Sequence, residues 1–128
     1  MHNIMVTFFM LLALTGNSFA DDTDTTKNFF GFGSVENAID EISSVPGALI
    51  SETNDRTIIS IEAERVRWEF PSKSQPYYPS IIKSQVLMVN GKIDYQVNIA
   101  CQAEEAKCEE ISKLYAAHVE DVKQQLSQ

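Results

Sequence analysis

The dipeptide Asn90-Gly91 lies between two runs of alternating apolar and polar residues, and it constrains the fold more than any other feature of the chain. Asn-Gly favours the two-residue turn of an antiparallel hairpin, because both residues tolerate positive φ. The turn pairs strands 81–89 and 92–100 and gives them one apolar face and one polar face. The pairs on the apolar face are Met88 with Ile93, Val86 with Tyr95, Ser84 with Val97, and Ile82 with Ile99.

A second antiparallel pair is predicted upstream, where segments 48–53 and 57–63 flank a turn at Asn54-Asp55. The turn sets Ile50 opposite Ile59 and Ala48 opposite Ile61, so the apolar side chains share one face.

The apolar alternation changes phase after Ala63, and it continues at Val66, Trp68 and Phe70. One extra residue in a strand shifts the alternation in this way. We interpret the shift as a β-bulge near Glu64-Arg65 within one long strand, which leaves the chain with four strands.

Two amphipathic segments flank the strands. Ser34 is a typical N-cap for a helix that ends at Pro46-Gly47, and a longer helix is predicted from about Ala103 to the C-terminus. Together these elements predict a single α+β domain. It has one four-stranded antiparallel sheet, a meander, with an N-terminal and a C-terminal helix in the order α-β-β-β-β-α, and both helices on one face.

The first 20 residues contain an apolar run followed by Ser18-Phe19-Ala20, the small-residue pattern that precedes signal-peptide cleavage. We therefore divide the chain into a cleaved signal peptide (1–20), a flexible polar segment (21–28) and the single domain (29–128). The expected location is the periplasm or the extracellular space, with no membrane insertion after the leader is removed.

Cys101 and Cys108 are the only cysteines in the sequence. In an oxidising compartment such a pair usually forms a disulfide. On one helix their spacing spans about 10.5 Å, which is too far for a bond. The bond therefore requires Cys101 to precede the helix, as the end of strand 92–100 predicts.

The net charge of −8 disfavours binding to nucleic acid or to an anionic membrane. No motif for a catalytic serine, a zinc protease or a phosphate loop occurs, so we expect no enzymatic activity, no metal and no cofactor. His118 lies on the apolar stripe of the C-terminal helix, which favours a structural histidine over a general base.

Protein binding has better candidates. The proline-rich loop 71–80 carries Tyr77 and Tyr78, and aromatic side chains on a stiffened loop bind at low entropic cost. Trp68 is of a residue type common at interface hot spots, and we add Glu62 and Glu64 near a strand edge. The alternative is that Tyr77 and Tyr78 fold back as a lid on the core. The aromatic segment 29–33 is expected to pack on the core.

A cleaved leader, a compact acidic domain, one disulfide and no catalytic constellation together resemble the periplasmic immunity proteins. These proteins protect bacteria from secreted cell-wall-degrading effectors, including type VI secretion toxins. The resemblance implies a protein partner, a secreted cell-wall hydrolase, whose active site this chain occludes. The alternatives are an accessory or assembly protein of an envelope or secretion system, and a small-ligand carrier. A homodimer is also expected, because Ile58, Leu87 and Val89 suggest an apolar strip on the uncovered face.

Overall fold

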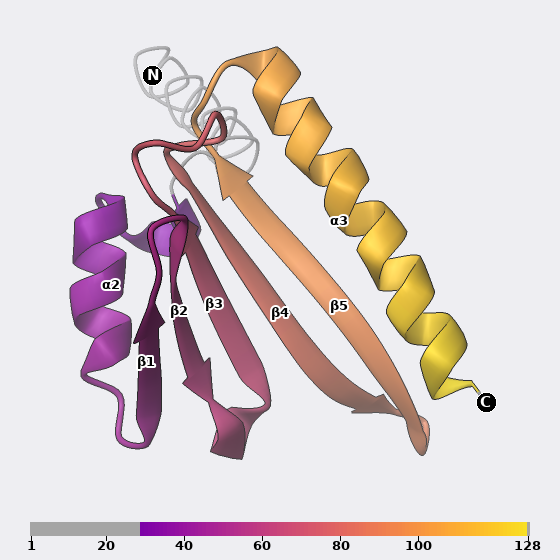
Figure 1. Cartoon of the computed structure of the whole chain (residues 1–128). Coiled ribbons are helices and arrows are strands. Elements are labelled where there is room, and N and C mark those ends of the chain that lie inside the picture. The colour runs from indigo at the N-terminus through magenta and orange to yellow at the C-terminus, as the bar shows by residue number, and fades with distance from the viewer. Residues whose placement is uncertain (1–28, 128) are drawn as a thin grey trace, which may run out of the picture.

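The computed structural model describes residues 29–127. The signal peptide (1–20) and the polar segment (21–28) lie outside the described residues. One antiparallel sheet and two α-helices form an α+β fold, as predicted (Figure 1). Its elements are α2 (Val35–Ser43), β1 (Ala48–Glu52), β2 (Arg56–Ile61), the 3-10 helix η2 (Glu62–Glu64), β3 (Val66–Pro71), β4 (Ser80–Val89), β5 (Lys92–Cys101) and α3 (Glu105–Leu126).

The sheet has five strands in the order β1-β2-β3-β4-β5, so the prediction of four strands was wrong. The difference lies at residues 62–65. There η2 and Arg65, which has a left-handed φ of 55°, reverse the chain instead of forming a bulge. Strand β3 therefore folds back antiparallel to β2, with Ile59 opposite Trp68 and Ile61 opposite Val66. A chain reversal and a bulge produce the same shift of the apolar alternation, and only the pairing distinguishes them.

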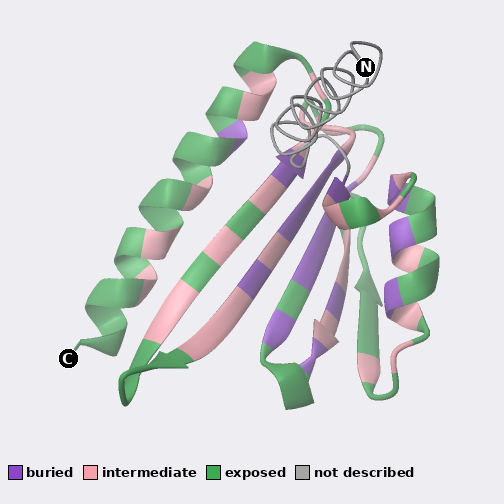
Figure 2. Ribbon diagram, turned by 180° about the vertical axis from the view of Figure 1, so that it is seen from behind, coloured by how far each residue is buried: buried purple, intermediate pink, exposed green. Residues whose placement is uncertain are grey.

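Apolar side chains are buried on both faces of the sheet, so the two helices cover opposite faces rather than one. Helix α2 packs with Ile59, Trp68 and Phe70 in the main core. Neighbouring residues of β4 point to opposite faces. Ile81 joins that core, whereas Ile82 faces Ile111 and Tyr115 of α3. Figure 2 shows buried residues along the middle strands and mostly exposed residues on α3.

The helix α2 forms for the reasons that the sequence indicates. The Ser34 hydroxyl accepts a hydrogen bond from the Asn37 backbone N–H at 3.1 Å. Val35, Ala38 and Ile42 occupy one stripe and are buried. Phe29 at 3% exposure also belongs to this core, as predicted for the aromatic segment.

The expected apolar strip does not form. On β2, Ile58 lies two residues after Arg56 and so shares its face, the α3 side of the sheet. On β4, Leu87 and Val89 lie an even number of residues after Ile81 and share its face, the α2 side. The prediction of one uncovered surface requires Ile82 to share a face with Ile59, whereas Ile81 does so in the structure.

A disulfide joins Cys101 to Cys108, as predicted, with their Cα atoms 5.7 Å apart. Cys101 is the last residue of β5, and Cys108 lies in the first turn of α3. The bond fixes the start of α3 to the end of the sheet, so the helix runs back along β5 (Figure 1).

Candidate functional site

The structure does not gather the expected partner-binding residues into one surface. Tyr77 and Tyr78 are half-buried, and they lie on different sides of the sheet. Tyr78 packs against the α2 core, and its hydroxyl donates to the Glu36 carboxylate at 3.2 Å. Burial and this hydrogen bond raise the pKa of Tyr78. Tyr77 lies near Ile82 and Ile111 on the α3 side. The loop thus closes one end of the sheet.

Trp68 is buried in the core at 8% exposure. The rings of Phe30 and Phe32 contact it edge-on, with centroids at 5.5 and 6.1 Å, and the Lys83 ammonium lies 5.2 Å from its ring. Its position on the α2 side leaves it little surface for a partner.

Glu62 and Glu64 are exposed on η2. They lie at the opposite end of β2 and β3 from the 72–79 loop (Figure 1). Since a six-residue strand spans about 20 Å, one small contact cannot include both groups of candidates.

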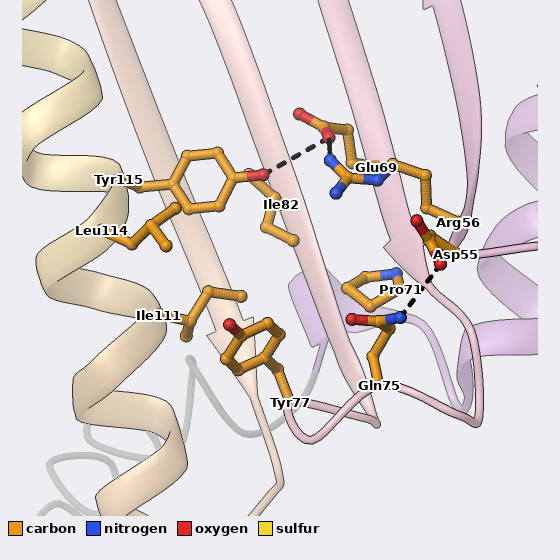
Figure 3. Close-up of a pocket in the computed structure, with 10 residues that line it drawn as sticks. All are labelled: Asp55, Arg56, Glu69, Pro71, Gln75, Tyr77, Ile82, Ile111, Leu114 and Tyr115. Atoms are coloured by element: carbon orange, nitrogen blue, oxygen red, sulfur yellow. Dashed lines mark hydrogen bonds and ion pairs between the residues drawn. The ribbon is translucent and has the colours of Figure 1, made fainter.

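A pocket of about 160 Å³ lies between β3, β4, α3 and the 72–79 loop (Figure 3). One wall is apolar, with Ile82, Ile111 and Leu114, and the opposite wall carries Arg56 and Glu69. The remaining lining residues are Asp55, Pro71, Gln75, Tyr77 and Tyr115. The volume is below the ~300 Å³ at which small-molecule sites usually begin.

Glu69 organises the polar side of this pocket. Its carboxylate is buried, and Oε1 accepts hydrogen bonds from Arg56 Nη1 at 2.7 Å and from the Tyr115 hydroxyl at 3.3 Å. Arg67 Nε lies 3.9 Å from Oε2, which is an ion pair without a hydrogen bond. The bond with Glu69 raises the pKa of Arg56. Burial, with the nearby Glu69 charge, raises the pKa of Tyr115 to about 12.

Two further hollows adjoin the pocket along the same face. Arg56 and Glu69 also line a hollow of about 250 Å³ beside Leu114 and His118. Arg67 lines both this hollow and a third one of about 310 Å³ that includes Arg65 and Tyr95. We call these three adjoining hollows the arginine trough. It runs beside α3 and is defined by Arg56, Arg65, Arg67, Glu69, Tyr95, Leu114, Tyr115 and His118.

Toward its tip, the β4–β5 hairpin diverges from β3 and from the rest of the sheet (Figure 1). Strand β3 pairs with β4 only from Glu69↔Ile82 to Val66↔Gln85, whereas β4 and β5 pair as far as Val89↔Lys92. Residues 87–94 therefore have no strand beside them other than each other, and we call them the projecting hairpin (Figure 1). The part of the hairpin beyond its pairing with β3 is about 10 Å long.

Large apolar side chains are exposed on the projecting hairpin. Met88 is 57% exposed, Ile93 is 53% exposed and Val89 is 46% exposed, and Leu126 at the end of α3 adds to them. Met88 and Ile93 are paired and share the α3 side with the trough residue Tyr95. An ion pair of 3.6 Å between Lys123 and Asp94 holds the helix end against the hairpin. The projecting hairpin and the arginine trough thus form one surface.

Sequence reasoning missed the projecting hairpin as a site. In the structure each strand of the hairpin is ten residues long, whereas β3 has six, so part of the hairpin lacks a neighbour. The predicted single long strand with a bulge concealed this difference in length. The predicted register was correct for all four pairs. Arg67 and Glu69 alternate with Trp68 and Phe70 along β3. Since Trp68 and Phe70 face α2, Arg67 and Glu69 lie on the α3 face of the sheet.

Within residues 29–127, no group of three or more His, Cys, Asp or Glu side chains could hold a metal ion. His118 Nε2 lies 3.2 Å from the Tyr95 hydroxyl, which gives this histidine a hydrogen-bond partner at the trough. None of the helices in the described part of the chain is long and apolar enough to span a bilayer.

Comparison of the chain with protein-family models, with curated proteins and with solved structures found no match in any of the three.

Proposed function

We propose that this chain is an exported protein-binding domain, a periplasmic immunity or inhibitor protein that occludes the active site of a peptidoglycan-degrading toxin. The observation that carries the proposal is the projecting hairpin, with Met88, Val89 and Ile93 exposed on a segment that no other strand flanks. Exposed apolar side chains on a protruding element are typical of a protein interaction site.

The hairpin is held in shape before it binds. Its two strands pair over their full length, the disulfide joins the end of β5 to α3, and Lys123 of α3 lies in ion-pair distance of Asp94 near the tip. A preorganised element loses little conformational entropy on binding. Insertion of such a hairpin into an enzyme cleft blocks the substrate sterically, with no chemistry by the inhibitor.

Two observations bear on the compartment in which the chain acts and on the alternative functions. A disulfide between the only cysteines supports an oxidising compartment outside the cytoplasm. A small-ligand carrier, the alternative, would hold its ligand between the sheet and α3, in the pocket of about 160 Å³ and the adjoining hollows of about 250 and 310 Å³. Tyr77 and Glu62, at the two ends of the arginine trough, remain candidates for contacts at the margin.

The test is capture of a partner from native envelope and secreted fractions with tagged protein, followed by an inhibition assay. We expect one cell-wall hydrolase in stoichiometric amount, and we expect the purified chain to stop that enzyme from clearing a peptidoglycan suspension. Recovery of envelope-assembly components would favour the accessory function instead.

The hairpin variant Met88→Ser with Ile93→Ser tests the mechanism. We expect the inhibition constant to rise at least about a hundredfold, because paired apolar hot spots carry most of the binding free energy of an interface. The matched control is Leu49→Ser, which removes an apolar side chain of similar exposure from β1 and leaves Ile50 unchanged. Equal inhibition by the hairpin variant and the control would exclude the hairpin from the mechanism.

A further inference from the structure

The arginine trough contains hydrogen-bond donors that the described residues leave without acceptors. All three arginines of the sequence, Arg56, Arg65 and Arg67, line it. Each guanidinium presents several N–H donors in a fixed fork. Within residues 29–127, Arg56 uses one of these groups on Glu69, and Arg67 makes only its 3.9 Å ion pair.

Glu69 takes up only part of this excess. Its Oε1 accepts from Arg56 and Tyr115, and its Oε2 faces Arg67 Nε at 3.9 Å, so one carboxylate serves both arginines. The side chains of Arg56 and Arg67 are 44% and 53% exposed, so their remaining donors face the trough opening. The other acidic lining groups, Asp55 and Glu62, lie at the two ends of the trough. The centre therefore carries one more positive than negative charge.

Apolar groups accompany these donors. Leu114 is 55% exposed beside Arg56 and Arg67, and Val86 and the Tyr95 ring lie beside Arg65. The trough follows β3 for about 20 Å, the length of roughly six residues of extended peptide. Arginine binds a carboxylate through two parallel hydrogen bonds, and partial exclusion of water strengthens them.

We propose that the arginine trough binds an extended acidic segment of the partner protein, with a carboxylate side chain seated between Arg67 and Arg56 and an apolar side chain against Leu114. This inference rests on the proposed function, because the trough is continuous with the projecting hairpin and would contact the same partner. It also names the partner's chemistry. The overall charge of −8 attracts basic surfaces, whereas the centre of the trough, with Arg56 and Arg67 against Glu69, favours an acidic group.

The test uses a synthetic peptide of alternating glutamate and leucine as the probe, and protein purified from the periplasm. Binding is followed by NMR through the arginine Nε–Hε signals, together with fluorescence titration. We expect the peptide to shift the signals of Arg56 and Arg67 and to bind at least about tenfold more tightly than a peptide with glutamine in place of glutamate.

The variant Arg65→Gln with Arg67→Gln should weaken peptide binding about tenfold. These arginines are chosen because neither is hydrogen-bonded to Glu69, so the fold keeps the Arg56–Glu69 pair. The matched control, Lys73→Gln with Lys113→Gln, removes two positive charges elsewhere and should change the affinity less than about twofold.

Three results would overturn the proposal: no glutamate preference, an equal loss of affinity in the lysine control, or displacement of the peptide by inorganic phosphate or anionic vesicles at lower concentration than the peptide itself. The Met88→Ser/Ile93→Ser variant separates this inference from the proposed function. It should lose inhibition of the hydrolase and keep the peptide affinity, because its substitutions lie outside the trough.

Discussion

At the scale of single residues, Glu69 links the sheet to α3. It is a buried carboxylate on β3 that joins Arg56 of β2 to Tyr115 of α3. A buried charge is tolerated only when it is paired and hydrogen-bonded. Both hydrogen-bond donors, Arg56 and Tyr115, are therefore needed to stabilise the buried Glu69 carboxylate. Of the two, Tyr115 is the one whose protonation reports on its contact with Glu69.

Alkaline pH should weaken the fold through Tyr115. Its pKa is about 12 in the folded chain, against an ordinary value of 10.0, because burial and Glu69 disfavour the phenolate. The raised pKa contributes stability that is fully present below pH 10.0 and is lost as the pH rises toward about 12. We expect the free energy of unfolding, measured with urea, to fall over this range and to fall less steeply in Tyr115→Phe.

Two further measurements check the cause. Ultraviolet difference titration of Glu69→Gln should show the pKa of Tyr115 nearer its ordinary value, because one of the charges that raise it is gone. Tyr78, whose pKa is also raised, contributes in the same direction, so Tyr115→Phe should not abolish the pH dependence completely. Parallel stability curves for wild type and Tyr115→Phe would show that Tyr115 does not titrate as stated.

At the scale of elements, the sequence predicts what short turns determine. The Asn90-Gly91 turn has φ values of 53° and 79°, and the predicted register of its hairpin is confirmed. The register of β1 with β2 is confirmed in the same way, with Ile50 opposite Ile59. A two-residue turn sets the pairing locally, so alternation and turn chemistry are sufficient.

The pairing of strands that no short turn connects was not predictable from the same signals. The reversal at residues 62–65 depends on β3 pairing with β2 on one side and β4 on the other, which local alternation does not reveal. The contact between Glu69 and Tyr115 joins residues 46 positions apart. For the same reason the sequence located the Tyr77-Tyr78 loop but left open whether it projects or folds back on the core, and it missed the arginine trough, whose residues come from β2, the segment before β3, β3, β5 and α3.

The disulfide joins two elements, β5 and α3, and its removal should loosen the attachment of the helix to the sheet. The loop that it closes is short, with a sequence separation of 7. On the chain-entropy model such a loop stabilises the fold by about 2–3 kcal/mol. Cys101→Ser with Cys108→Ser should therefore unfold at lower urea concentration, with the loss measured by linear extrapolation.

Reduction of the wild-type protein provides the control for the substitutions themselves. Reduced wild type and the double serine variant should unfold at similar urea concentrations, because both lack the same cross-link. If oxidised and reduced wild type were equally stable, the bond would contribute nothing to folding, and the non-covalent contacts of α3 with the sheet would be sufficient to hold it.

At the scale of the whole molecule, the two edges of the sheet differ. Helix α3 runs along β5 (Figure 1), and Ala116 and Val119 line a hollow with Val97 and Ile99. The other edge is β1, in which four of five residues are exposed. Leu49 and Ile50 are 57% and 51% exposed and point to opposite faces. Natural edge strands are usually protected by lysine, proline or a bulge, and the segment Ala48–Glu52 has neither of these residues.

We expect β1 to pair with β1 of a second copy, which would extend the sheet across a two-fold axis. A symmetric antiparallel pair centred on Ile50 places Ala48 opposite Glu52, so no like charges face each other across the new ladder. Each chain carries a charge of −8, however, and the two copies repel at low ionic strength. The dimer should therefore strengthen as salt is added, the reverse of an interface held by ion pairs.

Sedimentation equilibrium over a range of protein and sodium chloride concentrations measures this association. The variant Ile50→Lys places two like charges opposite each other at the axis and should remain monomeric throughout, whereas a wild-type protein that stays monomeric at high salt would show that the β1 edge is closed to self-association.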